Sequence, residues 1–155
     1  MQQFKTLEDL RQYLSRLEKW FGRPIVDGGH PTLYFDNPND SRFVLGIRRD
    51  DYLFSQCGNW IEPSRGHGLS FSASWRHLKG IYRLKGKHNP GKAVHVYWVL
   101  EKADIPSGLE FHPDPDDDAH YYLCVVERMR VDELRQKLLW VADRMAMIRD
   151  GQVAL

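Results

Sequence analysis

Two segments with helical periodicity lie near the ends of the chain, and short β-favouring runs separate them. The first covers residues 6–21, where apolar side chains recur at spacings of three and four: Leu7, Leu10, Leu14, Leu17 and Phe21. Thr6 is a suitable N-cap, and Gly22 with Arg23-Pro24 would end this helix. The second covers residues 131–148 and would end at Gly151. Helices that flank a group of strands favour an α+β fold with a mostly antiparallel or mixed sheet.

The stretches between these helices alternate β-favouring runs with turn sequences rich in Gly, Pro, Asn and Asp. The strongest runs are AVHVYWVL at 93–100 and AHYYLCVVE at 119–127. Shorter strands are expected at 32–35, 42–48, 52–54 and 109–111. Residues 69–75 are expected to be either a strand or the junction between a strand and a helix. Residues 57–68, 86–91 and the acidic segment 112–118 are expected to be loops or turns.

The composition limits the classes of protein that the chain can belong to. Its 155 residues predict a single domain over residues 1–155. The formal net charge of +1 argues against nucleic-acid binding driven by net charge alone. Cys57 and Cys124 lie in unrelated contexts, so we predict no disulfide framework and no metal site. Without a secretory signal or an apolar run long enough to cross a membrane, the sequence predicts a cytoplasmic protein with no membrane contact.

Two short sequences are candidate sites. In SRGHGLSFS, residues 64–72, two glycines flank His67, and the exposed amides of such a loop can hold a phosphate or a carboxamide. The alternative is a loop with a surface histidine. In residues 120–122, strand alternation would put His120 and Tyr122 on one face of a sheet and Tyr121 on the other. His120 would then either line a cleft or form a hydrogen bond at the end of the sheet.

Other patterns are less specific. The acidic residues of 114–118 lack the register of a calcium loop, so a solvated loop is favoured. Residues 75–92 carry six fixed cations and two histidines beside Trp75 and Tyr82. This segment would suit either a solvated face or a surface that follows a phosphate backbone. Ser70 and His120 lack a nucleophile elbow and an obvious orienting acid, so they do not indicate a hydrolase.

The order of the motifs resembles that of a known family. Gly68-Leu69-Ser70-Phe71 is followed by Tyr97-Trp98-Val99-Leu100, by Ile105-Pro106-Ser107-Gly108-Leu109, by an acidic loop, by His120-Tyr121, and by Met129 before a final helix. Residues 66–140 are thereby similar to the ADP-ribosyltransferase toxin domain of bacterial type VI secretion effectors. Leu69 stands where that family often has threonine, and Val125 where it has proline. The resemblance implies a split β-sheet with N-terminal and C-terminal helices, and NAD+ as the substrate in its central cleft.

The resemblance also implies roles for residues near that cleft. Ser70 would shape the nicotinamide pocket, with His120 in the same cleft. Gly68 and Tyr121 would contact NAD+, as the neighbours of these two residues in the matched motifs.

An arginine on an early strand would hold the dinucleotide, because a guanidinium can bind phosphate through two hydrogen bonds. Arg48 is the residue assigned here, and Arg42 and Arg49 are the alternatives. Glu127 has the residue type of a catalytic carboxylate beside the ribose, although it does not match a motif position of the family.

The resemblance therefore implies an enzyme that transfers ADP-ribose from NAD+ to a protein, RNA or DNA acceptor. Such an enzyme would act as a toxin or secreted effector, with an antitoxin or immunity protein as a further partner. One alternative is a small ribonuclease or RNA-binding toxin that uses His67 and His120 as acid and base. Another is a non-enzymatic immunity or adaptor protein, in which the five Trp and seven Tyr residues help form a partner surface.

Overall fold

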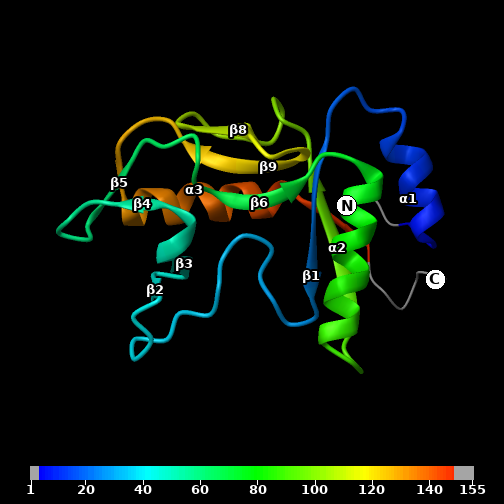
Figure 1. The fold of residues 1–155 in the computed structure, drawn as a ribbon, viewed down its shortest axis with the longest axis horizontal. Helices are drawn as coiled ribbons and strands as arrows, with labels where there is room; N and C mark the ends of the chain where they lie inside the picture. The colour runs from blue at the N-terminus through cyan, green and yellow to red at the C-terminus, as the bar shows by residue number, and fades with distance from the viewer. Residues whose placement is uncertain (1–3, 149–155) are drawn as a thin grey trace.

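A six-stranded sheet in the order β11-β7-β1-β6-β9-β8 is the centre of the fold (Figure 1). The computed structural model describes residues 4–148, and the strands that pair in this part of the chain are antiparallel. With three α-helices, this arrangement confirms the predicted α+β class. The elements are α1 (Leu7–Leu14), β1 (Phe21–Val26), β2 (Phe43–Val44), β3 (Ile47–Arg48), the 3-10 helix η1 (Arg49–Asp51), β4 (Leu53–Phe54), β5 (Trp60–Glu62), β6 (Leu69–Ser72), α2 (Trp75–His88), β7 (Val94–Val99), β8 (Leu109–Asp114), β9 (Asp117–Val125), β10 (Met129–Arg130), α3 (Val131–Arg144) and β11 (Ala146–Ile148).

The large sheet separates at its middle. β1 pairs with β7 at six positions but with β6 at the single position Gly22↔Ser72. Beyond this position the two strands diverge, and in Figure 1 β1 runs roughly vertically whereas β6 and β9 run roughly horizontally. A Cβ added to Gly22 would lie 3.2 Å from both methyl groups of Leu78. Glycine therefore lets α2 pack closely where the two halves of the sheet meet.

Two buried clusters stabilise the two halves. One joins β6, β8 and β9 to α3 and includes the rings of Phe21 and Phe111, which stack with centroids 3.8 Å apart. The other joins α1 and α2 to β7 through Leu10, Leu78 and Val96. One cluster thus packs on α3 and the other on α1 and α2, and Phe21 of β1 and Val99 of β7 connect the first cluster to the β1–β7 half.

The helix expected over residues 6–21 ends at Leu14. Phe21 lies instead in β1, where it is fully buried. Its spacing from Leu17 matches a helix by coincidence, because Phe21 is buried by the sheet and not by a helix face. Arg23 and Pro24, expected to stop the helix, lie inside β1. Proline is tolerated there because β6 has already separated from that strand.

The basic segment 75–92, to which the sequence assigns no helix bounds, contains α2. Since β6 ends at Ser72 and α2 begins at Trp75, residues 69–75 are the junction between a strand and a helix, one of the two structures expected for them. The Ser74 side chain caps this helix by accepting a hydrogen bond from the backbone N–H of His77 at 3.2 Å. Leu78 and Tyr82 are its fully buried residues, and Gly80 and Gly86 interrupt the apolar pattern. The helical periodicity is therefore weak, and the turn expected at 86–91 begins only after His88.

The C-terminal helix α3 ends at Arg144 and not at residue 148. Residues Ala146–Ile148 form β11, which pairs with β7. The expected helix end at Gly151 lies outside the described residues. The acidic segment 112–118 is not a long loop, because β8 continues to Asp114 and β9 begins at Asp117.

The segment between β1 and β6 is largely irregular. Residues 32–35 do not form the expected strand. Residues 42–48 form the hairpin β2–β3, which turns at Leu45 and Gly46, both with positive φ. The strand expected at 52–54 is present as β4, and the expected loop at 57–68 contains β5, which pairs with both β4 and β10.

Candidate functional site

A cavity of about 430 Å³, here called the split cavity, lies where β1 and β6 separate. It brings together three residues assigned from the sequence, namely Arg48, Ser70 and His120. Its lining comes from several elements: Gly22, Arg23 and Pro24 of β1, Tyr34, Arg48 of β3, Ser70, Phe71 and Ser72 of β6, His77, Ile81 and Lys85 of α2, and His120 of β9.

Strand register explains why Ser70 and His120 share this cavity. β6 pairs with β9 so that Ser70 is opposite Tyr122 and Ser72 is opposite His120. Directly paired residues of antiparallel strands project from the same face of a sheet. The prediction that His120 and Tyr122 share a face is therefore confirmed.

Three other assigned residues do not line the split cavity. A Cβ on Gly68 would lie 2.3 Å from the carbonyl oxygen of Leu123, so this glycine permits close approach of β9. The ring of Tyr121 packs 5.0 Å from that of Phe21 on the core side of the sheet. Glu127 follows the end of β9 and lines a different cavity, beside Gly108.

Arg23 is a lining residue that the sequence analysis did not assign to the site. Its Nη1 donates a hydrogen bond to the carbonyl oxygen of Ser70 at 2.9 Å. Its Nε donates to the carbonyl oxygen of Pro31, also at 2.9 Å. The guanidinium thus connects β1 to β6 across the split, and it also connects β1 to the loop that follows β1. An Arg-Pro sequence is typical of a helix end, so the sequence carries no signal for this role of Arg23.

Three cations line the split cavity, and no carboxylate is among its lining residues. Besides Arg23, Arg48 donates to Asp51 at 2.8 Å, which raises the pKa of the guanidinium, and it lies 5.3 Å from the ring of Tyr34. Lys85 has a lowered pKa because it is partly buried and because Arg23 is close. An anion bound here would relieve the repulsion between these cations.

Two histidines form the other wall of the split cavity. The rings of His77 and His120 stack with centroids 5.6 Å apart. Nδ1 of His120 lies 2.9 Å from Oδ2 of Asp114, whose pKa is lowered by the backbone N–H of Asp116 and by His120. An ionised carboxylate only accepts hydrogen bonds, so Nδ1 of His120 carries the hydrogen. In the neutral ring, Nε2 then has a lone pair that can accept a proton.

His77 has a different set of neighbours. Its Nδ1 lies 2.6 Å from Oγ of Ser72, and its Nε2 lies 3.6 Å from Oδ2 of Asp117. His67, the expected acid–base partner of His120 in a ribonuclease, bonds to Ser64 in the loop before β6 and is not among the residues that line the split cavity. The histidine beside His120 is therefore His77, which lies in the basic segment 75–92 and was not predicted to belong to the site.

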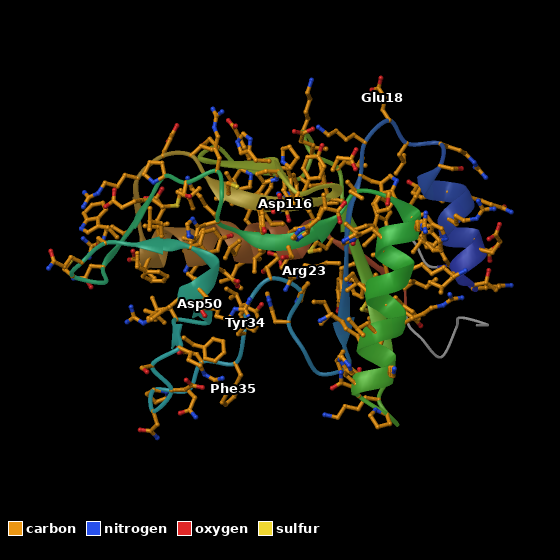
Figure 2. The ribbon with its side chains drawn as sticks, in the orientation of Figure 1. Glu18, Arg23, Tyr34, Phe35, Asp50 and Asp116 are labelled. Atoms are coloured by element: carbon orange, nitrogen blue, oxygen red, sulfur yellow. The ribbon has the colours of Figure 1, made fainter. Side chains whose placement is uncertain are left out.

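A second cavity of about 420 Å³ adjoins the split cavity and shares Arg23, Tyr34 and Lys85 with it. It is also lined by Asp27, the glycines after it and the ring of Phe35, which is 85% exposed. Figure 2 shows Arg23 and Tyr34 near the middle of the molecule and Phe35 farther out, toward the β2 side. The two cavities thus meet at two cations and a tyrosine.

Other kinds of site in residues 4–148 would be a further cavity, a metal-binding cluster or a membrane-spanning helix. A cavity of about 510 Å³ beside the ion pair of Lys19 and Glu101 contains none of the assigned residues. Within this part of the chain, no three His, Cys, Asp or Glu side chains are grouped to hold a metal ion. In the same residues, no helix has the length and apolar character needed to cross a membrane.

Comparisons of the chain with protein-family models, with curated proteins and with solved structures gave no match.

Proposed function

We propose that the protein is a toxin-like ADP-ribosyltransferase that takes ADP-ribose from NAD+ and binds NAD+ at the split between β1 and β6. The observation that carries this proposal is the pair of adjoining cavities that meet at Arg23 and Lys85. NAD+ consists of two nucleoside halves joined by a diphosphate. Cations at the junction suit the diphosphate, and each adjoining cavity can receive one half.

The nicotinamide half belongs in the split cavity, beside Ser70 and His120. When the bond from C1′ of the ribose to the nicotinamide nitrogen breaks, its electron pair leaves with neutral nicotinamide. The acceptor then forms a bond to C1′, and its proton passes to Nε2 of His120, which Asp114 orients through Nδ1. Ser70, on the exposed side of β6, contacts the nicotinamide. This proposal gives the role of base to His120 and not to Glu127.

Release of nicotinamide from NAD+ tests the proposal. We expect purified protein to release nicotinamide, and His120→Ala to reduce the rate by about 100-fold or more, as is typical for the loss of acid–base catalysis. Ser70→Ala should also reduce the rate, because it removes the contact to the nicotinamide. His67→Ala is the matched control, because it removes a histidine that lies outside the split cavity. Folded wild-type protein that neither binds nor consumes NAD+ would rule the proposal out.

The stacked histidines favour a second candidate, a ribonuclease. His77 and His120 could serve as base and acid in phosphodiester cleavage, with Arg23, Arg48 and Lys85 stabilising the charge on phosphorus. Assays of RNA cleavage and of NAD+ consumption on the same purified protein separate the two candidates. A ribonuclease should cleave RNA without consuming NAD+, and His77→Ala should abolish that cleavage.

A further inference from the structure

The helix α2 carries a strong positive charge that the net charge of +1 conceals. It has no acidic residue and five fixed cations: Arg76, Lys79, Arg83, Lys85 and Lys87. Among residues 4–148, these cations form no ion pairs. Its acidic neighbours are Asp117, which shares a cavity with Arg76, and Glu8, whose pKa is lowered chiefly by Arg11 and less by Lys79. Charge is therefore uncompensated along most of the helix.

Three of these cations form a row on the exposed face of α2. Arg76, Arg83 and Lys87 are exposed, and their spacings of seven and four residues put them on one side of the helix. The row is about 16 Å long at 1.5 Å per residue. Each of the three cations in this row can contact one phosphate of a nucleic-acid strand. Gly80 lies within the row and leaves the helix surface open there.

The row leads to the split cavity. A cavity of about 370 Å³ on this face of α2 is lined in part by Arg76 and Gly80. It shares His77 and Ile81 with the split cavity. A strand bound along α2 would therefore reach the position where ADP-ribose is released.

We propose that the exposed face of α2 binds the phosphate backbone of the acceptor, and that this acceptor is a nucleic acid. The transfer step rests on the proposed function. In it, the C1′–nicotinamide bond breaks, a hydroxyl or amino group of the nucleic acid bonds to C1′, and the proton passes to His120.

The surroundings of the row favour nucleic acid over an acidic protein. Protein interfaces have an apolar centre from which charged residues are depleted. The exposed face of α2 offers Leu84 as its one large apolar side chain, at 48% exposure. Tyr82 is buried and Trp75 is partly buried against the core, so neither offers an open ring for stacking on bases. Binding should therefore depend on phosphates and not on base sequence.

Binding is measured by fluorescence anisotropy with labelled 20-nucleotide RNA and DNA single strands of mixed sequence, over a series of salt concentrations. The triple variant Arg76→Gln/Arg83→Gln/Lys87→Gln should lower the slope of log K against log salt by about 2, since each phosphate contact on a single strand contributes about 0.7. Arg16→Gln/Arg65→Gln/Lys102→Gln removes the same charge from exposed positions on other parts of the chain. It should leave the slope nearly unchanged.

Equal losses in the two triple variants, or an unchanged slope in the α2 variant, would overturn the proposal. The transfer step is tested with NAD+ labelled in the adenylate, incubated with RNA, DNA and protein separated from a bacterial extract. We expect label in a nucleic-acid fraction, lost in the α2 variant, while nicotinamide release without acceptor is unchanged. Label confined to protein would refute the choice of acceptor. If neither the wild type nor the triple variants release nicotinamide, the proposed function is refuted. The binding of nucleic acid to α2 would still stand, because the binding data do not depend on NAD+.

Discussion

At the scale of single residues, Gly68 shows how closely two strands of the sheet approach. A Cβ at this position would lie 2.3 Å from the carbonyl oxygen of Leu123, which is backbone and cannot move aside cheaply. We therefore expect Gly68→Ala to lower the free energy of unfolding by about 3 kcal/mol or more. Urea unfolding followed by far-UV circular dichroism measures this change.

Gly66 is a matched control for that substitution. It lies two residues earlier in the same loop, and nothing lies within 4 Å of the position of its Cβ. Gly66→Ala should change stability by less than about 0.5 kcal/mol. If both variants were equally stable, the close pairing of Gly68 with β9 would be wrong.

His30 gives the loop after β1 a dependence on pH. Its Nδ1 accepts hydrogen bonds from the backbone N–H groups of Thr32 at 3.2 Å and Leu33 at 3.0 Å. Its pKa is lowered by burial and by Arg135, so the folded state favours the neutral ring. Between the lowered pKa and the ordinary value of 6.5, the unfolded chain binds more protons. Stability conferred by His30 is therefore full above pH 6.5 and is lost as the pH falls through the folded pKa.

The effect should be modest, because the hydrogen-bonded side of the ring is only part-buried and His30 as a whole is exposed. His30→Asn is the matched variant, since an asparagine side chain can accept the same two backbone hydrogen bonds without titrating. We expect the unfolding midpoint of the wild type to fall more than that of His30→Asn between pH 7 and pH 5. Parallel midpoints over this range would show that the ring does not support the loop.

The site residues differ in how far the sequence could predict them. Ser70 and His120 lie on regular strands, so alternation and motif order were enough to bring them to one cavity. Arg23 and His77 reach the same cavity through the separation of β1 from β6 and through the packing of α2. These are long-range features that no local pattern in the sequence records.

At the scale of elements, α2 is the largest difference between sequence and structure. Its glycines interrupt the helical spacing of apolar residues by which a helix is predicted, and they also destabilise the helix itself. Gly80 is exposed within α2, and nothing lies within 4 Å of the position of its Cβ. We expect Gly80→Ala to raise the free energy of unfolding by about 0.8 kcal/mol, because alanine loses less backbone entropy on folding.

A glycine with the same open space but a different backbone provides the control. Gly28 also has nothing within 4 Å of its Cβ position, but its φ is +87°. Gly28→Ala should therefore destabilise the protein by about 1 kcal/mol, since an alanine is strained in the left-handed region. Thermal denaturation of both variants compares the two effects. Opposite signs are expected, and destabilisation by Gly80→Ala would indicate a contact at that face of α2.

The ends of the two predicted helices show a second limit at this scale. Phe21 and Ile148 continue the helical spacing of the preceding apolar residues, yet they lie in β1 and β11. Both strands pair with β7, the strongest β-favouring run of the sequence. These residues form strands because they pair with β7, which is distant in the sequence. Local periodicity cannot predict such pairing.

At the scale of the whole molecule, the split lies between two halves of the sheet, and Phe21 of β1 and Val99 of β7 belong to the core of the β6–β9–β8 half. The large sheet is continuous between the two halves at the single pair Gly22↔Ser72, supplemented by the hydrogen bond from Arg23 to Ser70. A ligand that contacts both β1 and β6 binds the folded chain and not the unfolded one. NAD+ at 100 times its dissociation constant should then stabilise the protein by about 2.7 kcal/mol.

For a chain of this size, that stabilisation corresponds to a rise of roughly 5–10 °C in Tm. Differential scanning fluorimetry with NAD+, with nicotinamide alone and with AMP alone measures the rise. We expect NAD+ to give the largest shift, because either fragment occupies only one of the two adjoining cavities. Arg23→Gln, whose own Tm is measured first without ligand, should lose most of the shift, since it removes one of the two cations that both cavities share. An equal shift for AMP and NAD+ would mean that the split cavity takes no part in binding, and that the ligand occupies the neighbouring cavity alone.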